Sequence, residues 1–250
     1  MASLRPGAKV IGIGAVDVRK PDDLEKAAER CANELGSIDF VIAGAAGNFL
    51  APVTQLSSNA FKSVMEIDAV GSYNTWKATM PYLVDSAKRH KTDGTESSPS
   101  TGGRIIFVSA TLHYVGTPLQ THAAAAKAAV DALSNNVAIE FGPRGVTSNV
   151  IAPGPIDDTE GMARLGRPED KAATAKRIPS GRMGKTREIA DATIYLFSGS
   201  GNYVNGHALV VDGGAWRIGS IGMGGAFSYP DFLLSGDEVS GVEGRKKSKL

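Results

Sequence analysis

The fold is decided by one stretch, which reads RIIFVSATLHYVGTPLQTHAAAAKAAVDALSNNVAIEFGPRGVTSNVIAPGP over residues 104–155. Its two apolar runs, residues 104–109 and 147–151, are predicted to be buried strands. Between them, residues 123–141 form an alanine-rich helix pattern that ends before a Gly-Pro pair. A strand, a helix and a second strand in this order predict a right-handed βαβ unit with parallel strands.

The same alternation continues in both directions along the chain. Further strands are expected at residues 9–15, 38–43 and 208–211, and further helices at residues 21–35, 58–77 and 187–197. We therefore expect an α/β fold, a Rossmann-type doubly wound parallel sheet with helices on both faces. Such sheets bind ligands at the carboxyl ends of their strands, so residues just after each strand are candidates for the functional site.

Composition narrows the classes of partner. The chain has 250 residues, of which 42% are hydrophobic, and this suits one domain over residues 1–250. A formal net charge of +1 argues against a nucleic-acid partner. The longest apolar runs are shorter than the roughly 20 residues that a membrane span needs. Residues 88–103 are polar and rich in serine and glycine, which predicts a surface insertion.

The C-terminal tail, residues 240–250, is polar and closes in Ser248-Lys249-Leu250. Import receptors read this tripeptide at a C-terminus as an address for the peroxisome. We therefore expect the protein in the peroxisomal matrix, with the import receptor as a partner. The alternative is that the tripeptide arises by chance.

Several segments together carry a family resemblance. In chain order they are VDV at 16–18, AGAAG at 43–47, IDAVGSYN at 67–74, FVSAT at 107–111, Lys127, NVIAPGPI at 149–156 and VNGHALVVDGGAW at 204–216. In this order they resemble the short-chain dehydrogenase/reductase family. Residues 45–52, 56–68 and 153–165 more narrowly resemble the 2,4-dienoyl-CoA reductases, and the C-terminal tripeptide points to their peroxisomal branch.

Three departures from the wider family stand out. No nucleotide-binding glycine loop is present, because GIGA at residues 12–15 runs directly into VDV without a crossover helix. The chain is therefore expected to lack the first two βα units, which would leave an apolar edge at the strand of residues 38–43. Ala123 stands where the family has a catalytic tyrosine, and Asp68 where it has a helix asparagine. The peroxisomal branch is similar in both substitutions.

The resemblance implies NADPH-dependent reduction of a 2,4-dienoyl-CoA, a fatty acyl-CoA thioester, to a 3-enoyl-CoA in peroxisomal β-oxidation of unsaturated fatty acids. That reaction delivers hydride to the far end of the diene and a proton to the α carbon. By resemblance, Asp68 supplies the proton through an ordered water held with Lys127, which also binds the nicotinamide ribose. Ser109 is a third catalytic candidate, and His113 a possible further donor. An ion-paired structural Asp68 and a solvated Lys127 are the alternatives.

The resemblance also implies the binding residues, with no metal ligand among them. The expected cofactor-binding residues are Asp17, Lys127, Pro153, Gly154, Pro155, Ile156 and Thr159. The expected substrate-binding residues are Arg19, Phe49, Ser57, Ser58, Asn59 and Arg164. The two arginines suit coenzyme A, because guanidinium groups pair with phosphate in a bidentate way. Either arginine could instead be a surface charge.

Two other functions remain open at the sequence level. One is another peroxisomal enoyl-CoA reductase of the same fold. An alcohol dehydrogenase is disfavoured, because it needs an acid where Ala123 stands. The other is a catalytically inactive, truncated form that acts only in binding. By resemblance, the helices at residues 58–77 and 123–141 are also expected to pair in a homo-oligomer.

Overall fold

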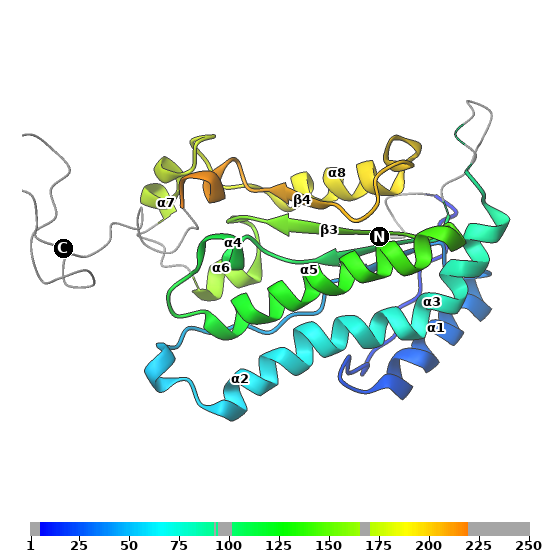
Figure 1. Cartoon of the computed structure of the whole chain (residues 1–250), viewed down its shortest axis with the longest axis horizontal. Coiled ribbons are helices and arrows are strands. Elements are labelled where there is room, and N and C mark those ends of the chain that lie inside the picture. The colour runs from blue at the N-terminus through cyan, green and yellow to red at the C-terminus, as the bar shows by residue number, and fades with distance from the viewer. Residues whose placement is uncertain (1–5, 93, 95–101, 166–170, 220–250) are drawn as a thin grey trace, which may run out of the picture.

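The computed structural model describes residues 6–92, 94, 102–165 and 171–219 (Figure 1). Its strands form one parallel sheet in the order β1-β2-β3-β4. Their bounds are Phe40–Ala43 for β1, Arg104–Val108 for β2, Thr147–Pro153 for β3 and Ala208–Val211 for β4. The sequence prediction of a parallel α/β fold is confirmed.

The sheet is covered by helices on both faces, as its buried residues show. Ile105 and Phe107 of β2 belong to one apolar core, and Ile106, which lies between them in the chain, belongs to another. Successive side chains of a strand point to opposite faces, so these are the two faces of the sheet. The first core packs against the helices α1 (Pro21–Leu35), α3 (Gly71–Arg89) and α5 (Thr121–Phe141), and the second against α8 (Thr186–Phe197).

Short helical segments complete the described part of the chain. They are η2 (Val53–Gln55), α2 (Ser58–Met65), η3 (Glu66–Val70), α4 (Leu112–Val115), η4 (Gly142–Arg144), α6 (Glu160–Leu165), α7 (Lys171–Arg177), η6 (Gly199–Gly201) and η7 (Ala215–Ile218). α2, η3 and α3 follow one another without a break, so the helix predicted at residues 58–77 runs on to Arg89. None of the described helices is long and apolar enough to cross a membrane.

The strand predicted at residues 9–15 is wrong. This segment belongs to no ladder of the sheet, and Val10 is 50% exposed. A strand needs a neighbour to satisfy its backbone N–H and C=O groups. The only described neighbour of β1 is β2, and no strand links residues 9–15 to either. The apolar pattern alone therefore does not make a strand here.

β1 is one edge strand of the described sheet, as expected from the sequence, and β4 is the other. Ile42 is 53% exposed and Phe40 is 42% exposed, although Phe40 stacks on Phe197 of α8 with ring centroids 4.7 Å apart. Exposed apolar edges promote pairing with other strands. Two other expectations lie outside the described residues, namely half of the surface insertion at residues 88–103 and the whole tail at residues 240–250.

Candidate functional site

A cavity of about 540 Å³ opens at the carboxyl ends of β1, β2 and β3. Each strand contributes the residues that follow it, as sheet topology predicts. The lining residues are Gly44, Ala46, Asn48, Val108, Ser109, Ala110, Thr111, Leu112, Gln120, Lys127, Pro153, Gly154, Pro155, Ile156, Thr159, Gly161, Met162 and Ile189. Many of the predicted site residues thus meet at one place.

Asp68 and Lys127 form a buried ion pair beside this cavity. Lys127 Nζ lies 3.2 Å from Asp68 Oδ2, and the side chains are 9% and 1% exposed. The other carboxylate oxygen, Oδ1, accepts a hydrogen bond of 2.6 Å from the backbone N–H of Gly47. Among the described residues, Oδ2 has no partner besides Lys127. The two expected catalytic residues therefore depend on each other for charge compensation.

A local departure from the α-helix places Asp68. It lies in η3, a π-helical segment between α2 and α3. Ser72 Oγ donates a hydrogen bond of 2.6 Å to the carbonyl of Asp68 and so occupies part of the widened turn. Such single π turns inside α-helices occur frequently at functional sites. This signal was not recognised in the sequence, where the segment was predicted as ordinary helix.

Lys127 has a hydrogen left for a ligand. Its ammonium carries three N–H donors. One donates to the carbonyl of Val108 at 3.0 Å, and one faces Asp68. Because Lys127 also lines the cavity, the third donor is available to a group bound there. The alternative of a solvated lysine does not fit this buried position.

Ser109 belongs to a second buried cluster, centred on Asp131 of α5. The Asp131 carboxylate accepts from His113 Nε2 at 2.8 Å and from the Tyr114 hydroxyl at 2.7 Å. Burial by itself would raise the pKa of Asp131, but hydrogen bonds from His113, Ser109 and Tyr114 outweigh burial and lower it below the ordinary value of 3.8. Burial and then Asp131 raise the pKa of Tyr114. His113, the possible further donor, does not line the cavity.

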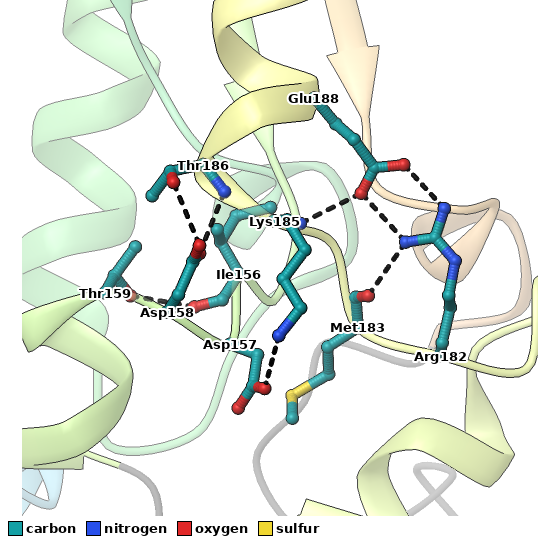
Figure 2. A network of polar contacts seen from close by, with 9 residues as sticks. All are labelled: Ile156, Asp157, Asp158, Thr159, Arg182, Met183, Lys185, Thr186 and Glu188. Atoms are coloured by element: carbon teal, nitrogen blue, oxygen red, sulfur yellow. Dashed lines mark hydrogen bonds and ion pairs between the residues drawn. The ribbon is translucent and has the colours of Figure 1, made fainter.

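The segment after β3 is held from outside the cavity (Figure 2). Asp158 accepts from the backbone N–H of Thr186 at 2.8 Å and from its hydroxyl at 2.9 Å, which ties the segment to the start of α8. Lys185 Nζ lies 2.8 Å from Asp157. Thr159, an expected cofactor ligand, donates its hydroxyl hydrogen to the carbonyl of Ile156 at 2.8 Å. The hydroxyl therefore organises the loop, and its hydrogen is already used.

The start of α8 is itself braced by an ion pair. Arg182 donates to Glu188 through two nitrogens, at 2.8 and 2.5 Å, and the backbone N–H of Lys185 donates to the same carboxylate at 2.9 Å (Figure 2). The side-chain hydrogen bond from Arg182 and then the backbone bond lower the pKa of Glu188 from 4.5 to about 2. The Glu188 carboxylate therefore fixes the start of α8, which carries Thr186, the partner of Asp158.

Lowering the pH should remove the contribution of Glu188 to the stability of the fold. A carboxyl whose pKa is lower in the folded state stabilises the fold above its unfolded pKa, and the contribution falls as pH drops through the folded pKa. We expect Glu188→Gln to lower the free energy of unfolding at neutral pH, with the difference shrinking from pH 4.5 towards about 2. Urea unfolding across this range measures it. Glu29→Gln, which alters an exposed glutamate of α1, is the control, and a difference that does not vary with pH contradicts the prediction.

Asp17 and Arg19 line a second cavity of about 490 Å³, together with Ala45 and Ile67. Asp17 is one of the expected cofactor-binding residues, and by resemblance to the family its carboxylate is predicted to accept from the adenine amino group. In the structure its carboxylate pairs with Arg19 at 2.7 Å, and the side-chain hydrogen bond from Arg19 lowers the pKa of Asp17 to about 2. Both residues therefore face one cavity as a pair. Their separate roles in binding adenine and coenzyme A remain predictions.

The other expected substrate-binding residues lie after β1 and in α2 and α6. Phe49 stacks on His122 with ring centroids 4.1 Å apart. Ser57 caps α2, its hydroxyl accepting from the backbone N–H of Ala60 at 3.2 Å, and Ser58 and Asn59 are exposed in the first turn. Arg164 lies in α6, but its side chain is outside the described part. Among the described side chains, Phe49, Ser57, Ser58 and Asn59 are not part of the lining of the cavity of about 540 Å³.

Sequence reasoning missed some polar residues of this region. Asn48 and Gln120 line the cavity and hydrogen-bond to each other at 2.5 Å across 72 residues of chain. Asp131 receives the hydrogen bonds of His113 and Tyr114. The spacing of Asp131 one helical turn after Lys127 was a usable signal, because residues four apart share a helix face. Nothing local indicated the Asn48–Gln120 pair.

Comparison with known proteins now decides the family. A model described as enoyl-(acyl carrier protein) reductase matches residues 3–215. The chain belongs to the short-chain dehydrogenase/reductase family. Within this family, the chain is 48% identical over 225 residues to a peroxisomal 2,4-dienoyl-CoA reductase of Saccharomyces cerevisiae, covering 90% of this chain and 71% of that protein. A Danio rerio protein of the same description is 45% identical over 203 residues, covering 81% of this chain and 63% of that protein.

Solved structures of short-chain dehydrogenases agree with the fold. A short-chain dehydrogenase from Bacillus anthracis is 36% identical, with a TM-score of 0.67, covering 79% of this chain and 73% of that one. A gluconate 5-dehydrogenase from Burkholderia cenocepacia, in complex with NADP and tartrate, is 26% identical, with a TM-score of 0.69, covering 79% and 72% of the two chains. The family of this chain therefore uses a nicotinamide cofactor.

The residues present fit parts of such a cofactor. The large cavity offers Lys127 with a free donor and the segment of residues 153–159, and the second cavity offers Asp17. Within residues 6–92, 94, 102–165 and 171–219, no glycine-rich turn joins a strand directly to an α-helix. That arrangement binds a pyrophosphate through the helix N-terminus. The described site therefore offers binding groups for the nicotinamide and adenine ends of the cofactor, and fewer for the pyrophosphate at its centre.

Proposed function

We propose that this short-chain dehydrogenase/reductase reduces 2,4-dienoyl-CoA to 3-enoyl-CoA with NADPH, in the peroxisomal β-oxidation of unsaturated fatty acids. The observation that carries the proposal is the buried pair of Asp68 in η3 and Lys127 in α5 beside the cavity. In α5, Ala123 stands where the family has a tyrosine. This pair can position a proton-donating water in a site that has no catalytic tyrosine. The relatives described as peroxisomal 2,4-dienoyl-CoA reductases support the substrate class and the peroxisomal location.

Different residues at the cavity have different roles in this reaction. When bound, the nicotinamide supplies the hydride that adds to the far end of the diene. Lys127 would hold the ribose with its third N–H, and its charge compensates that of the Asp68 carboxylate 3.2 Å away. Asp68 orients a water that gives a proton to the α carbon of the dienolate, and the hydroxide left behind takes a proton from the Lys127 ammonium, which is reprotonated from solvent after product release. Ser109 and the segment of residues 153–159 form the walls that exclude bulk water. The preference for NADPH rests on the family resemblance.

Turnover can be tested directly. The purified 250-residue chain is mixed with NADPH and 2,4-hexadienoyl-CoA, and the loss of NADPH absorbance is followed. We expect a loss that Asp68→Asn abolishes, and a product that mass spectrometry identifies as the 3-enoyl thioester. A folded chain that binds both molecules without turnover would instead support the second candidate, an inactive binding form. The exposed β1 edge is the observation that favours this second candidate.

We further propose that the tripeptide Ser248-Lys249-Leu250 is read by the peroxisomal import receptor. Removing residues 248–250 should leave an N-terminally fluorescent fusion of the full chain in the cytosol, because the receptor needs the terminal carboxylate and these side chains. Removing residues 240–242 instead is the matched control and should leave import intact. Fluorescence microscopy against a peroxisomal marker measures both. Equal import of the two deletions contradicts the proposal.

Self-association is proposed through the helical layer that holds α2, η3, α3 and α5. Large apolar side chains are exposed there, with Val70 46%, Tyr73 48% and Ile139 75% accessible. Apolar surface of this kind is typical of protein interfaces. The mass of the chain in solution, from light scattering, tests this. Tyr73→Glu should lower an oligomeric mass to that of one chain, and a single-chain mass before substitution contradicts the proposal.

A further inference from the structure

Two segments that each contribute a residue to the cavity lining, Asn48 and Gln120, are joined by a series of contacts. Asn48 Nδ2 donates to Gln120 Oε1 at 2.5 Å, His122 Nε2 lies 3.0 Å from the carbonyl of Phe49, and the backbone N–H of Ala51 donates to Leu119 at 2.9 Å. Leu119 adopts a φ of 66°, which is rare for a residue other than glycine. Residues in such conformations cluster at functional sites because the surroundings hold them there.

The orientation of both side-chain amides follows from one backbone contact. The backbone N–H of Phe49 donates to Asn48 Oδ1 at 2.8 Å. An amide oxygen can only accept and an amide nitrogen can only donate. The oxygen of Asn48 is therefore fixed by Phe49, and its nitrogen must face Gln120. That nitrogen needs an acceptor, so Gln120 turns its oxygen towards Asn48 and its nitrogen away.

The side-chain nitrogen of Gln120 therefore has N–H groups that can donate to a ligand. The residue is 3% exposed and lines the large cavity that Lys127 also lines. Among the described residues, Gln120 Nε2 has no hydrogen-bond partner. Gln120 Nε2 is not among the fully buried polar atoms that lack a partner. The nitrogen is therefore reached from the cavity, where a bound ligand can accept its hydrogens.

We infer that Gln120 is a catalytic residue, whose side-chain NH₂ donates to the thioester oxygen of the bound acyl-CoA. This assignment rests on the proposed function. When hydride adds to the far end of the diene, the electron pair moves through the conjugated bonds and the thioester oxygen becomes negative. A preorganised donor stabilises that charge most strongly where water is excluded. Asn48 is then a positioning residue, because it acts by holding the amide of Gln120 in the donating orientation.

The carbonyl stretching frequency of bound substrate tests this directly. 2,4-Hexadienoyl-CoA, labelled with ¹³C at the thioester carbon, is added to the full chain without NADPH, and infrared difference spectra are recorded. We expect a lower frequency than in solution, because the hydrogen bond polarises the carbonyl. Gln120→Glu keeps the acceptor for Asn48 but replaces the NH₂ by a carboxylate oxygen, so the frequency should return towards the solution value. Gln55→Glu, in η2, is the matched control and should leave the shift in place.

Asn48→Asp provides a second route that leaves Gln120 intact. The aspartate still accepts from Phe49, but it also attracts the NH₂ of Gln120, so the amide turns its oxygen to the cavity. This variant should also lose the frequency shift. Because the two variants change different side chains, failure of one to fold leaves the other as the test. In turnover, each should lower kcat on the order of 100-fold, with a smaller change in KM.

The outcomes separate the assignment from the proposed function. A shift that is absent in the unchanged chain, or is retained in a folded Gln120→Glu or Asn48→Asp variant, overturns the assignment of Gln120 while the reductase activity stands. If the unchanged chain does not bind hexadienoyl-CoA at all, the proposed function fails and the assignment fails with it. Loss of the shift and of kcat in both variants, with the Gln55→Glu control unaffected, supports the assignment.

Discussion

Lys127→Met is expected to abolish reduction and to destabilise the fold by about 3–5 kcal/mol. The reason is the position of Asp68, which is 1% exposed and has Lys127 3.2 Å away as its only compensating charge among the described residues. Removing one partner of a buried pair leaves the other charge without compensation, which costs more than the pair contributed. Urea unfolding measures the stability, and loss of NADPH absorbance measures the activity.

The double variant Asp68→Asn, Lys127→Met distinguishes charge compensation from packing. It removes both charges, so it should recover most of the lost stability while staying inactive. Lys62→Met is the control in an exposed pair, because Lys62 lies 3.6 Å from Glu66 with its side chain 72% exposed. Exposed pairs contribute about 0–1 kcal/mol, so this control should change little. A double variant that is no more stable than Lys127→Met alone contradicts the charge argument.

Gly154→Ala is expected to weaken NADPH binding and to destabilise the fold by about 1–3 kcal/mol. A Cβ at this position would lie 2.9 Å from the Cα of Asp212 and would overlap its Cβ. Asp212 cannot easily move, because its carboxylate accepts from the backbone N–H groups of Gly214 and Trp216, each at 2.8 Å. The loop must shift instead, and it lines the cavity. Thermal unfolding and NADPH titration by fluorescence measure the two effects.

Gly161→Ala is the matched control in the same loop region. A Cβ there meets nothing within 4 Å, and the residue lies in α6, where alanine is favoured over glycine by up to about 1 kcal/mol. This variant should keep or gain stability. If both glycine variants lose stability equally, the close approach to Asp212 is not the cause.

Much of the fold was predictable because burial patterns are local. The apolar runs at residues 104–109, 147–151 and 208–211 became β2, β3 and β4 with small changes at their ends. The helix at residues 21–35 begins at Pro21 and ends before Gly36, whose φ of 94° allows the chain to turn. The parallel order then brought the ends of three strands together at the cavity.

The two failures of the sequence prediction have different physical causes. Residues 9–15 have the apolar pattern of a strand, but a strand exists only beside another strand, and none is available to them among the described residues. The π turn at Asp68 also escaped prediction, because its residue pattern resembles that of an ordinary helix. Local secondary-structure propensity therefore predicts neither the missing strand nor the π turn.

The sequence by itself determined the alternation of strands and helices, the family resemblance, and the identity of Asp68 and Lys127 as candidates. Only the tertiary structure decided which polar groups meet: Asp68 with Lys127 at 3.2 Å, and Asn48 with Gln120 at 2.5 Å. Backbone pairing and burial follow from residue patterns within one element. A hydrogen bond between two loops depends on where whole strands end in space, and that position is set only when the sheet has assembled.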